Sequence, residues 1–158
     1  LGTARYEVVE TQAPTGFLLD RTPHIVDLAY ADQKTPVVEA RLNVSDDYTK
    51  VDISKVDASG EQEVEGAQLT LYGPDKTEID SWTSSDKPHR VEHLVPGTYS
   101  LREMMSPRTY DLAEEITFEI KDTGEVQPVA MKDAPIEIKG QVGQASGTCP
   151  TYRKGPVG

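Results

Sequence analysis

Short runs of alternating apolar and polar residues recur along the chain, rich in Val, Ile, Leu and Tyr. A period of two places successive side chains on opposite faces, which is typical of a β-strand with one buried face. Clusters of Gly, Pro and Asp separate the runs and predict turns. Many short strands joined by turns predict an all-β protein, a sandwich or a barrel. The runs are RYEVVE, HIVDLAY, VVEARLNV, KVDISKV, AQLTLYG, GTYSLRE, EITFEI and VQPVAM.

The chain also contains an internal repeat, in which YEVVETQAPTGFLLD matches YSLREMMSPRTYDLA. Counted from Tyr6 and from Tyr99, Glu follows four residues later, Pro eight later and an aromatic residue eleven later. Each copy continues with another strand and a final apolar strand that ends in an acid. Only the second copy is preceded by further strands, over residues 51–98. The repeat therefore represents the C-terminal half of a domain.

This organisation predicts three segments. Residues 1–50 form a truncated C-terminal half of a preceding repeat, and residues 51–139 form a complete domain. Residues 140–158 are rich in Gly and polar residues and are expected to form a flexible tail or linker. Because the chain starts in the middle of a strand pattern, we expect it to be a piece of a longer protein.

Composition excludes several classes of function. The formal net charge of −11 argues against binding to nucleic acid or to anionic lipid. Cys149 is the single cysteine, so neither an intrachain disulfide nor a thiolate metal cluster is expected. No run of 18 apolar residues occurs that would predict a membrane-spanning helix. We expect no cofactor and no metal site.

Three predicted strands carry an ionisable residue in phase with their inward apolar residues. These residues are Lys55, Glu103 and Asp133. For each one alone, the ordinary interpretation is a side chain that bends out to solvent at a strand end. A buried Lys–Asp ion pair is a second interpretation, although burying two charges is costly. Three such residues in one domain favour a chemical role.

That role follows from burial. Leaving water disfavours the charged forms of lysine and of carboxylic acids. A neutral lysine amine is a nucleophile, a protonated carboxyl carbon is an electrophile, and a neighbouring glutamate can move protons between them. We therefore predict an amide between the side chains of Lys55 and Asp133, formed with loss of water and assisted by Glu103.

The same residues resemble the CnaB-type, SpaA-like prealbumin-like domains of Gram-positive surface proteins and pilins. VDISKVDASGE resembles the family's first strand, with its reactive lysine at Lys55. VPGTYSLRE resembles the strand that carries the proton-shuttling glutamate, at Glu103. VQPVAMKDAP resembles the last strand, with its acceptor at Asp133. In the first copy, YEVVETQAPTGF places the equivalent glutamate at Glu10, and LNVSDDYTK places the acceptor position at Asp46.

The resemblance implies a Greek-key β-sandwich, prealbumin-like or reverse Ig-like, repeated along a stalk. It implies a stalk or spacer repeat of an adhesin or pilin-like protein in the cell wall or on the surface of a Gram-positive bacterium. The isopeptide bond would form once during folding, so the domain would not be an enzyme. Expected partners are neighbouring repeats of the same chain, and a host extracellular-matrix protein or glycan.

Lys55 is not expected to pair with Asp46, because nine residues of extended chain at about 3.3 Å each would hold them roughly 30 Å apart. The first copy has no lysine strand of its own. We therefore expect residues 1–50 to carry no cross-link and to be poorly packed on their own.

Two alternatives stay open. One is a host-matrix or glycan-binding adhesin module without a cross-link, in which Trp82 is an exposed anchor, although a lone Trp is more often core. The other is a glycosidase-like pair of Glu103 and Asp133, which requires an open cleft. His89 and His93 lie in a strand and turn, where a spacing of four does not bring two metal ligands together.

Overall fold

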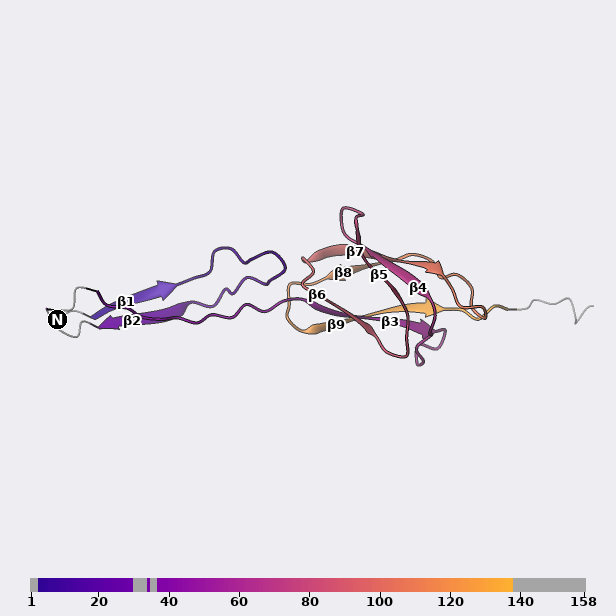
Figure 1. Cartoon of the computed structure of the whole chain (residues 1–158), viewed down its shortest axis with the longest axis horizontal. Helices are drawn as coiled ribbons and strands as arrows, with labels where there is room; N and C mark the ends of the chain where they lie inside the picture. The colour runs from indigo at the N-terminus through magenta and orange to yellow at the C-terminus, as the bar shows by residue number, and fades with distance from the viewer. Residues whose placement is uncertain (1–2, 30–33, 35–36, 138–158) are drawn as a thin grey trace, which may run out of the picture.

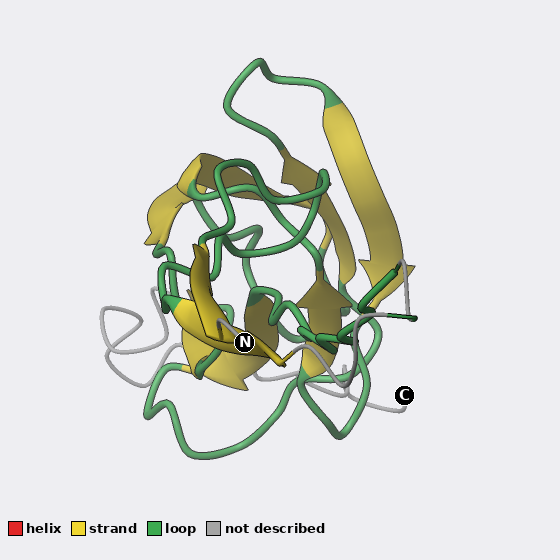
Figure 2. Cartoon of the chain, turned by 90° about the vertical axis from the view of Figure 1, so that its left-hand side faces the viewer, coloured by secondary structure: helices red, strands yellow, loops and turns green. Residues whose placement is uncertain are grey.

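The computed structural model of the chain describes residues 3–29, 34 and 37–137. Every regular element in these ranges is a β-strand, as Figure 2 shows, so the predicted all-β class is confirmed. The predicted tail lies outside the described residues. The strands are β1 (Thr3–Val8), β2 (His24–Ala29), β3 (Lys50–Asp57), β4 (Gln68–Tyr72), β5 (Glu78–Thr83), β6 (His89–Glu92), β7 (Gly97–Met105), β8 (Ile116–Ile120) and β9 (Val126–Asp133).

Strands β3 to β9 form a sandwich of two sheets (Figure 1). One sheet has the order β6-β3-β9, and the other has the order β5-β4-β7-β8. Strand β3 runs parallel to β9 and antiparallel to β6, whereas every pair in the larger sheet is antiparallel. In each sheet, a strand from the N-terminal half of the domain therefore pairs with a strand from the C-terminal half.

The core lies between the two sheets and follows the alternation seen in the sequence. Along β3 the side chains alternate between buried and half-buried up to Lys55. Each large apolar side chain that is fully buried contributes about 1.5–3 kcal/mol to folding. The core consists of Val51, Ile53, Ala67, Leu69, Leu71, Val91, Leu94, Tyr99, Leu101, Ile120 and Met131.

Strands β1 and β2 form a separate two-stranded sheet at one end of the elongated molecule (Figure 1). No described residue before Thr49 belongs to the buried set. A hairpin of two strands forms a single layer, so it cannot enclose a core without a second layer facing it. The expectation that this part is poorly packed agrees with its exposed apolar side chains.

Two sequence predictions differ from the structure. The run VVEARLNV, residues 37–44, was predicted as a strand but forms none. Its counterpart β9 is held by hydrogen bonds to β3, and residues 3–29 contain no strand equivalent to β3. Conversely, β5 was not predicted, because it is an edge strand whose side chains are mostly exposed.

The loop after β1 contacts the sandwich through a small aromatic cluster. The ring of His93 stacks on Tyr48 with 4.1 Å between centroids, and Phe17 meets the same ring edge-on at 4.9 Å. The carbonyl oxygen of Gly16 lies 3.1 Å from Nδ1 of His93. The backbone N–H of Leu18 also donates to the Asp47 carbonyl at 2.8 Å. These contacts hold the loop against the end of the sandwich.

We expect a Gly16→Ala substitution to open this junction. Gly16 has a φ of 87°, and an added Cβ would lie 3.1 Å from both Cβ and O of His93. The His93 ring signals in the NMR spectrum should shift, while the free energy of unfolding of the sandwich changes by less than about 0.5 kcal/mol. Gly66→Ala is the control, because Gly66 has a φ of 89° and an added Cβ meets nothing within 4 Å. Unchanged His93 signals in Gly16→Ala would contradict the prediction.

Candidate functional site

The three ionisable residues singled out in the sequence meet inside the sandwich. Lys55 on β3 and Asp133 on β9 belong to the same sheet, and Glu103 on β7 belongs to the facing sheet. In the parallel register Asp133 lies opposite Asp57, two residues beyond Lys55, so the lysine side chain reaches along the strand to the carboxyl group. All three side chains are fully excluded from solvent.

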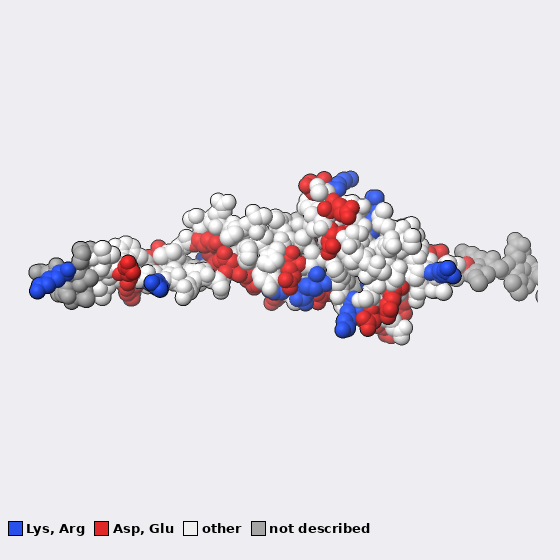
Figure 3. Space-filling model, in the orientation of Figure 1, with Lys and Arg blue, Asp and Glu red and all other residues white. Residues whose placement is uncertain are grey.

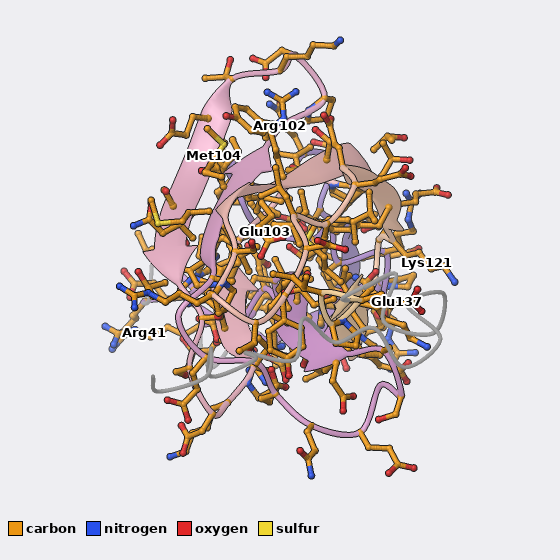
Figure 4. All side chains as sticks on the ribbon, turned by 90° about the vertical axis from the view of Figure 1, so that its right-hand side faces the viewer. Arg41, Arg102, Glu103, Met104, Lys121 and Glu137 are labelled. Carbon is orange, nitrogen blue, oxygen red and sulfur yellow. The ribbon has the colours of Figure 1, made fainter. Side chains whose placement is uncertain are left out.

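The contacts within this triad are short. The Nζ of Lys55 lies 2.5 Å from Oδ1 of Asp133 and 3.4 Å from Oε2 of Glu103. Glu103 is fixed by the backbone N–H of Ala113, which donates to Oε2 at 2.6 Å. Figure 4 shows Glu103 in the interior, while its neighbours Arg102 and Met104 lie toward the outside. One amine therefore lies within reach of two carboxyl groups, in a dry environment.

The triad contains one basic and two acidic side chains. With all three groups ionised, one positive and two negative charges would leave a buried net charge of −1. Among the described residues, Oδ2 of Asp133 and Oε1 of Glu103 have no hydrogen-bond partner. Unpaired buried oxygens and uncompensated buried charge are both costly.

The arrangement also favours a reaction. The triad holds an amine and a carboxyl group, the two reactants of an amide bond, at contact distance, which corresponds to a high effective concentration.

The burial of the triad decides between the interpretations drawn from the sequence. The solvated strand end is wrong for Lys55, Glu103 and Asp133, because each is at most 2 % exposed. The glycosidase-like pair requires an open cleft, whereas the side chains of Glu103 and Asp133 are fully buried. Trp82 is half-buried against the core and stacks on His89 at 4.2 Å, so the exposed anchor is also wrong.

Sequence reasoning missed the hydrogen bond from Ala113 that holds Glu103. The same bond occurs in the first copy at the same spacing. There the N–H of Asp20, ten residues after Glu10, donates to Oε2 of Glu10 at 2.6 Å. The hydrogen bond from His24 and the N–H of Thr22 lower the pKa of Asp20 to about 2.

Equivalent backbone hydrogen bonds also relate the acceptor positions of the two copies, Asp46 and Asp133. The N–H of Leu18 donates to the carbonyl of Asp47, and the N–H of Asp111 donates to the carbonyl of Ala134. Asp46 therefore occupies the place that Asp133 has in the sandwich, one residue before the accepting carbonyl. Asp46 and Glu10 are both half-buried. The first copy thus reproduces the two acidic positions, whereas the described residues before Thr49 contain no counterpart of the lysine strand.

Charged side chains of both signs lie on the surface of the described part of the chain. Figure 3 shows acidic side chains on both the hairpin and the sandwich, with basic ones between them. No group of three His, Cys, Asp or Glu among the described residues could hold a metal ion. None of the described elements is a helix long and apolar enough to cross a membrane.

Comparison with known proteins places this geometry in context. The SpaA family model, described as a prealbumin-like fold domain, matches residues 49–135, more than half of the chain. The TIE protein of Bacillus anthracis is similar with 26% identity and a TM-score of 0.55, over 86% of this chain and 26% of that one. The chain therefore spans about a quarter of that structure. No curated protein matches the sequence.

Two pilin structures are also similar. BcpA, the major pilin subunit of Bacillus cereus, is 23% identical over 54% of this chain and 28% of that one, with a TM-score of 0.47. GBS52, the minor pilin of Streptococcus agalactiae, is 20% identical over 56% of this chain and 44% of that one, also with a TM-score of 0.47. The predicted prealbumin-like fold is confirmed by the family match.

Proposed function

Because the chain belongs to the SpaA family of prealbumin-like fold domains, we propose that residues 49–135 form a stalk or spacer module of a Gram-positive surface protein. A self-formed isopeptide bond between Lys55 and Asp133 stabilises the module. Its partners are neighbouring repeats of the same chain. The first copy, about residues 1–50, is the C-terminal half of a preceding module.

The observation that carries this proposal is the contact between the lysine and the aspartate. An amine 2.5 Å from a carboxyl oxygen, with both side chains fully buried, already has the separation that amide formation starts from. A buried ion pair of this kind adds little net stability by itself. A covalent bond would remove the charges and keep the two strands joined under load.

The reaction balances within the triad. The neutral amine of Lys55 attacks the carboxyl carbon of protonated Asp133, and Glu103 accepts a proton from the attacking nitrogen. Glu103 then returns that proton to a hydroxyl of the tetrahedral intermediate, and water leaves. The products are an amide, one water molecule and an unchanged Glu103. The step occurs once per chain, which is why the module is not an enzyme.

Intact mass of the denatured full chain tests this proposal. We expect a mass about 18 Da below that of the sequence, because one water is lost, and fragment ions that join the peptides of Lys55 and Asp133. Lys55→Ala should restore the full mass. Lys50→Ala is the matched control, because Lys50 lies on the same strand and pairs with Asp47 instead. A wild-type mass equal to that of the sequence would overturn the isopeptide assignment.

A further inference from the structure

An apolar groove runs along the face of the β1–β2 hairpin and the extended segment after it. Its volume is about 810 Å³, and it is open to solvent. A soluble protein rarely leaves a contiguous apolar surface uncovered unless something binds there. Most of the residues that line the groove are apolar, among them Tyr6, Val8, Val26, Leu28, Leu42 and Val44, and the charged residues Glu7, Glu39 and Arg41 line it as well.

The repeat identifies this groove as one half of a sandwich core. Tyr6 and Val8 on β1 correspond to Tyr99 and Leu101 on β7, counted from the first Tyr of each copy. Tyr6 is 53% exposed and Val8 is 44% exposed, whereas Tyr99 is 4% exposed and Leu101 is fully buried. The first copy therefore has the same inward-facing residues without a cover.

The extended segment that ends at Val44 also lines the groove, and it follows the same correspondence with the second copy. With Asp46 in the place of Asp133, Val44 takes the place of Met131, two residues earlier. Met131 is 1% exposed, and Val44 is 41% exposed. Residues 37–44 also belong to no strand, and no described strand pairs with them as β3 pairs with β9. Unpaired extended backbone beside an apolar groove is a template for an added strand.

The second copy shows what covers such a face. Strand β3 pairs with β9 and inserts Val51 and Ile53 into the core, and β4 pairs with β7 and inserts Leu69. Strand β3 also carries Lys55, which meets the two acids. In the first copy Glu10 and Asp46 hold the acidic positions, so a complementary segment needs a cation at the place of Lys55.

We propose that this groove docks a lysine-bearing β-segment with the pattern of residues 49–72. The segment adds strands beside β1 and beside residues 37–44, fills the groove with alternate apolar side chains, and directs its lysine toward Glu10 and Asp46. The docking is non-covalent and does not depend on the isopeptide bond of the sandwich, so each proposal can fail without the other.

Methyl NMR of the full chain tests the docking. The probe is a synthetic polypeptide with the sequence of residues 49–72. We expect saturable shifts of the Val8, Leu28 and Leu42 methyl signals, while those of Leu101 stay in place because the intact sandwich already contains its own β3. A probe with alanine at the position of Lys55 should bind at least about tenfold more weakly, because the two acids lose their counter-ion.

Variants of the groove provide the controls. Leu42→Asp should weaken binding at least about tenfold, because it places a charge in the groove, and it lies outside the β1–β2 ladder that holds the hairpin together. Val8→Asp is a second groove variant. Ile25→Asp is the matched control, because Ile25 is 54% exposed and does not line the groove.

Three results would overturn the proposal. The first is groove signals that do not shift at millimolar probe. The second is equal weakening by Ile25→Asp and Leu42→Asp, which would mean that the probe binds elsewhere. The third is a dimer of the chain alone in sedimentation, with groove signals that depend on chain concentration, which would mean that a second copy occupies the groove.

Discussion

Replacing Glu103 by glutamine is expected to leave Lys55 and Asp133 unjoined and to lower the free energy of unfolding by about 4–5 kcal/mol. The bond would close a loop from residue 55 to residue 133, which is 79 residues by 133 − 55 + 1. In the chain-entropy description of cross-links, a loop of this length corresponds to about 4.5 kcal/mol at 25 °C. Glutamine keeps the shape of Glu103 and can still accept the Ala113 N–H, but it cannot take a proton.

Guanidinium unfolding and intact mass, measured on the same samples, check this result. Glu114→Gln is the matched control, because Glu114 is exposed and lies in the neighbouring loop. It should keep both the mass deficit and the wild-type midpoint. A Glu103→Gln protein that retains the deficit would remove Glu103 from the reaction. Loss of the deficit without loss of stability would mean that the cross-link does not hold the folded state together.

A second large effect is expected from Leu101→Ala, which should lower the free energy of unfolding by about 3 kcal/mol. Leu101 is fully buried on the central strand β7, and truncation of such a residue leaves a cavity in addition to the lost burial. Val8 is its equivalent in the first copy but is 44% exposed. Val8→Ala should therefore cost less than about 1 kcal/mol.

Thermal or guanidinium unfolding of the two variants checks whether the chain consists of a complete module and an incomplete first copy. Both substitutions shorten a side chain at the same position of the repeat, so they differ mainly in what surrounds it. Equal losses would contradict the proposal that residues 49–135 fold as the complete module while the first copy remains half a sandwich.

Some features of the fold could be predicted from the sequence because they depend on residues that are close together along the chain. The alternation along KVDISKV is a property of seven successive residues and predicted both β3 and the inward direction of Lys55. The repeat predicted Glu10, because it follows Tyr6 by four residues as Glu103 follows Tyr99, whereas Asp46 was assigned from the resemblance of LNVSDDYTK to the family's last strand. The prediction failed for residues 37–44, since a strand requires a partner and alternation alone does not supply one.

By itself, the sequence determined the all-β class, the repeat and the residues that face inward, because all of these follow from periodicity along a single chain. Only the tertiary structure decided that Lys55 lies 2.5 Å from an oxygen of Asp133, 78 residues away, and 3.4 Å from Glu103 on the other sheet. It also decided that Ala113 holds Glu103 and that an apolar groove stays open on the first copy. The physical reason is that these distances depend on which strands become neighbours across the two sheets, and strand alternation does not encode that pairing.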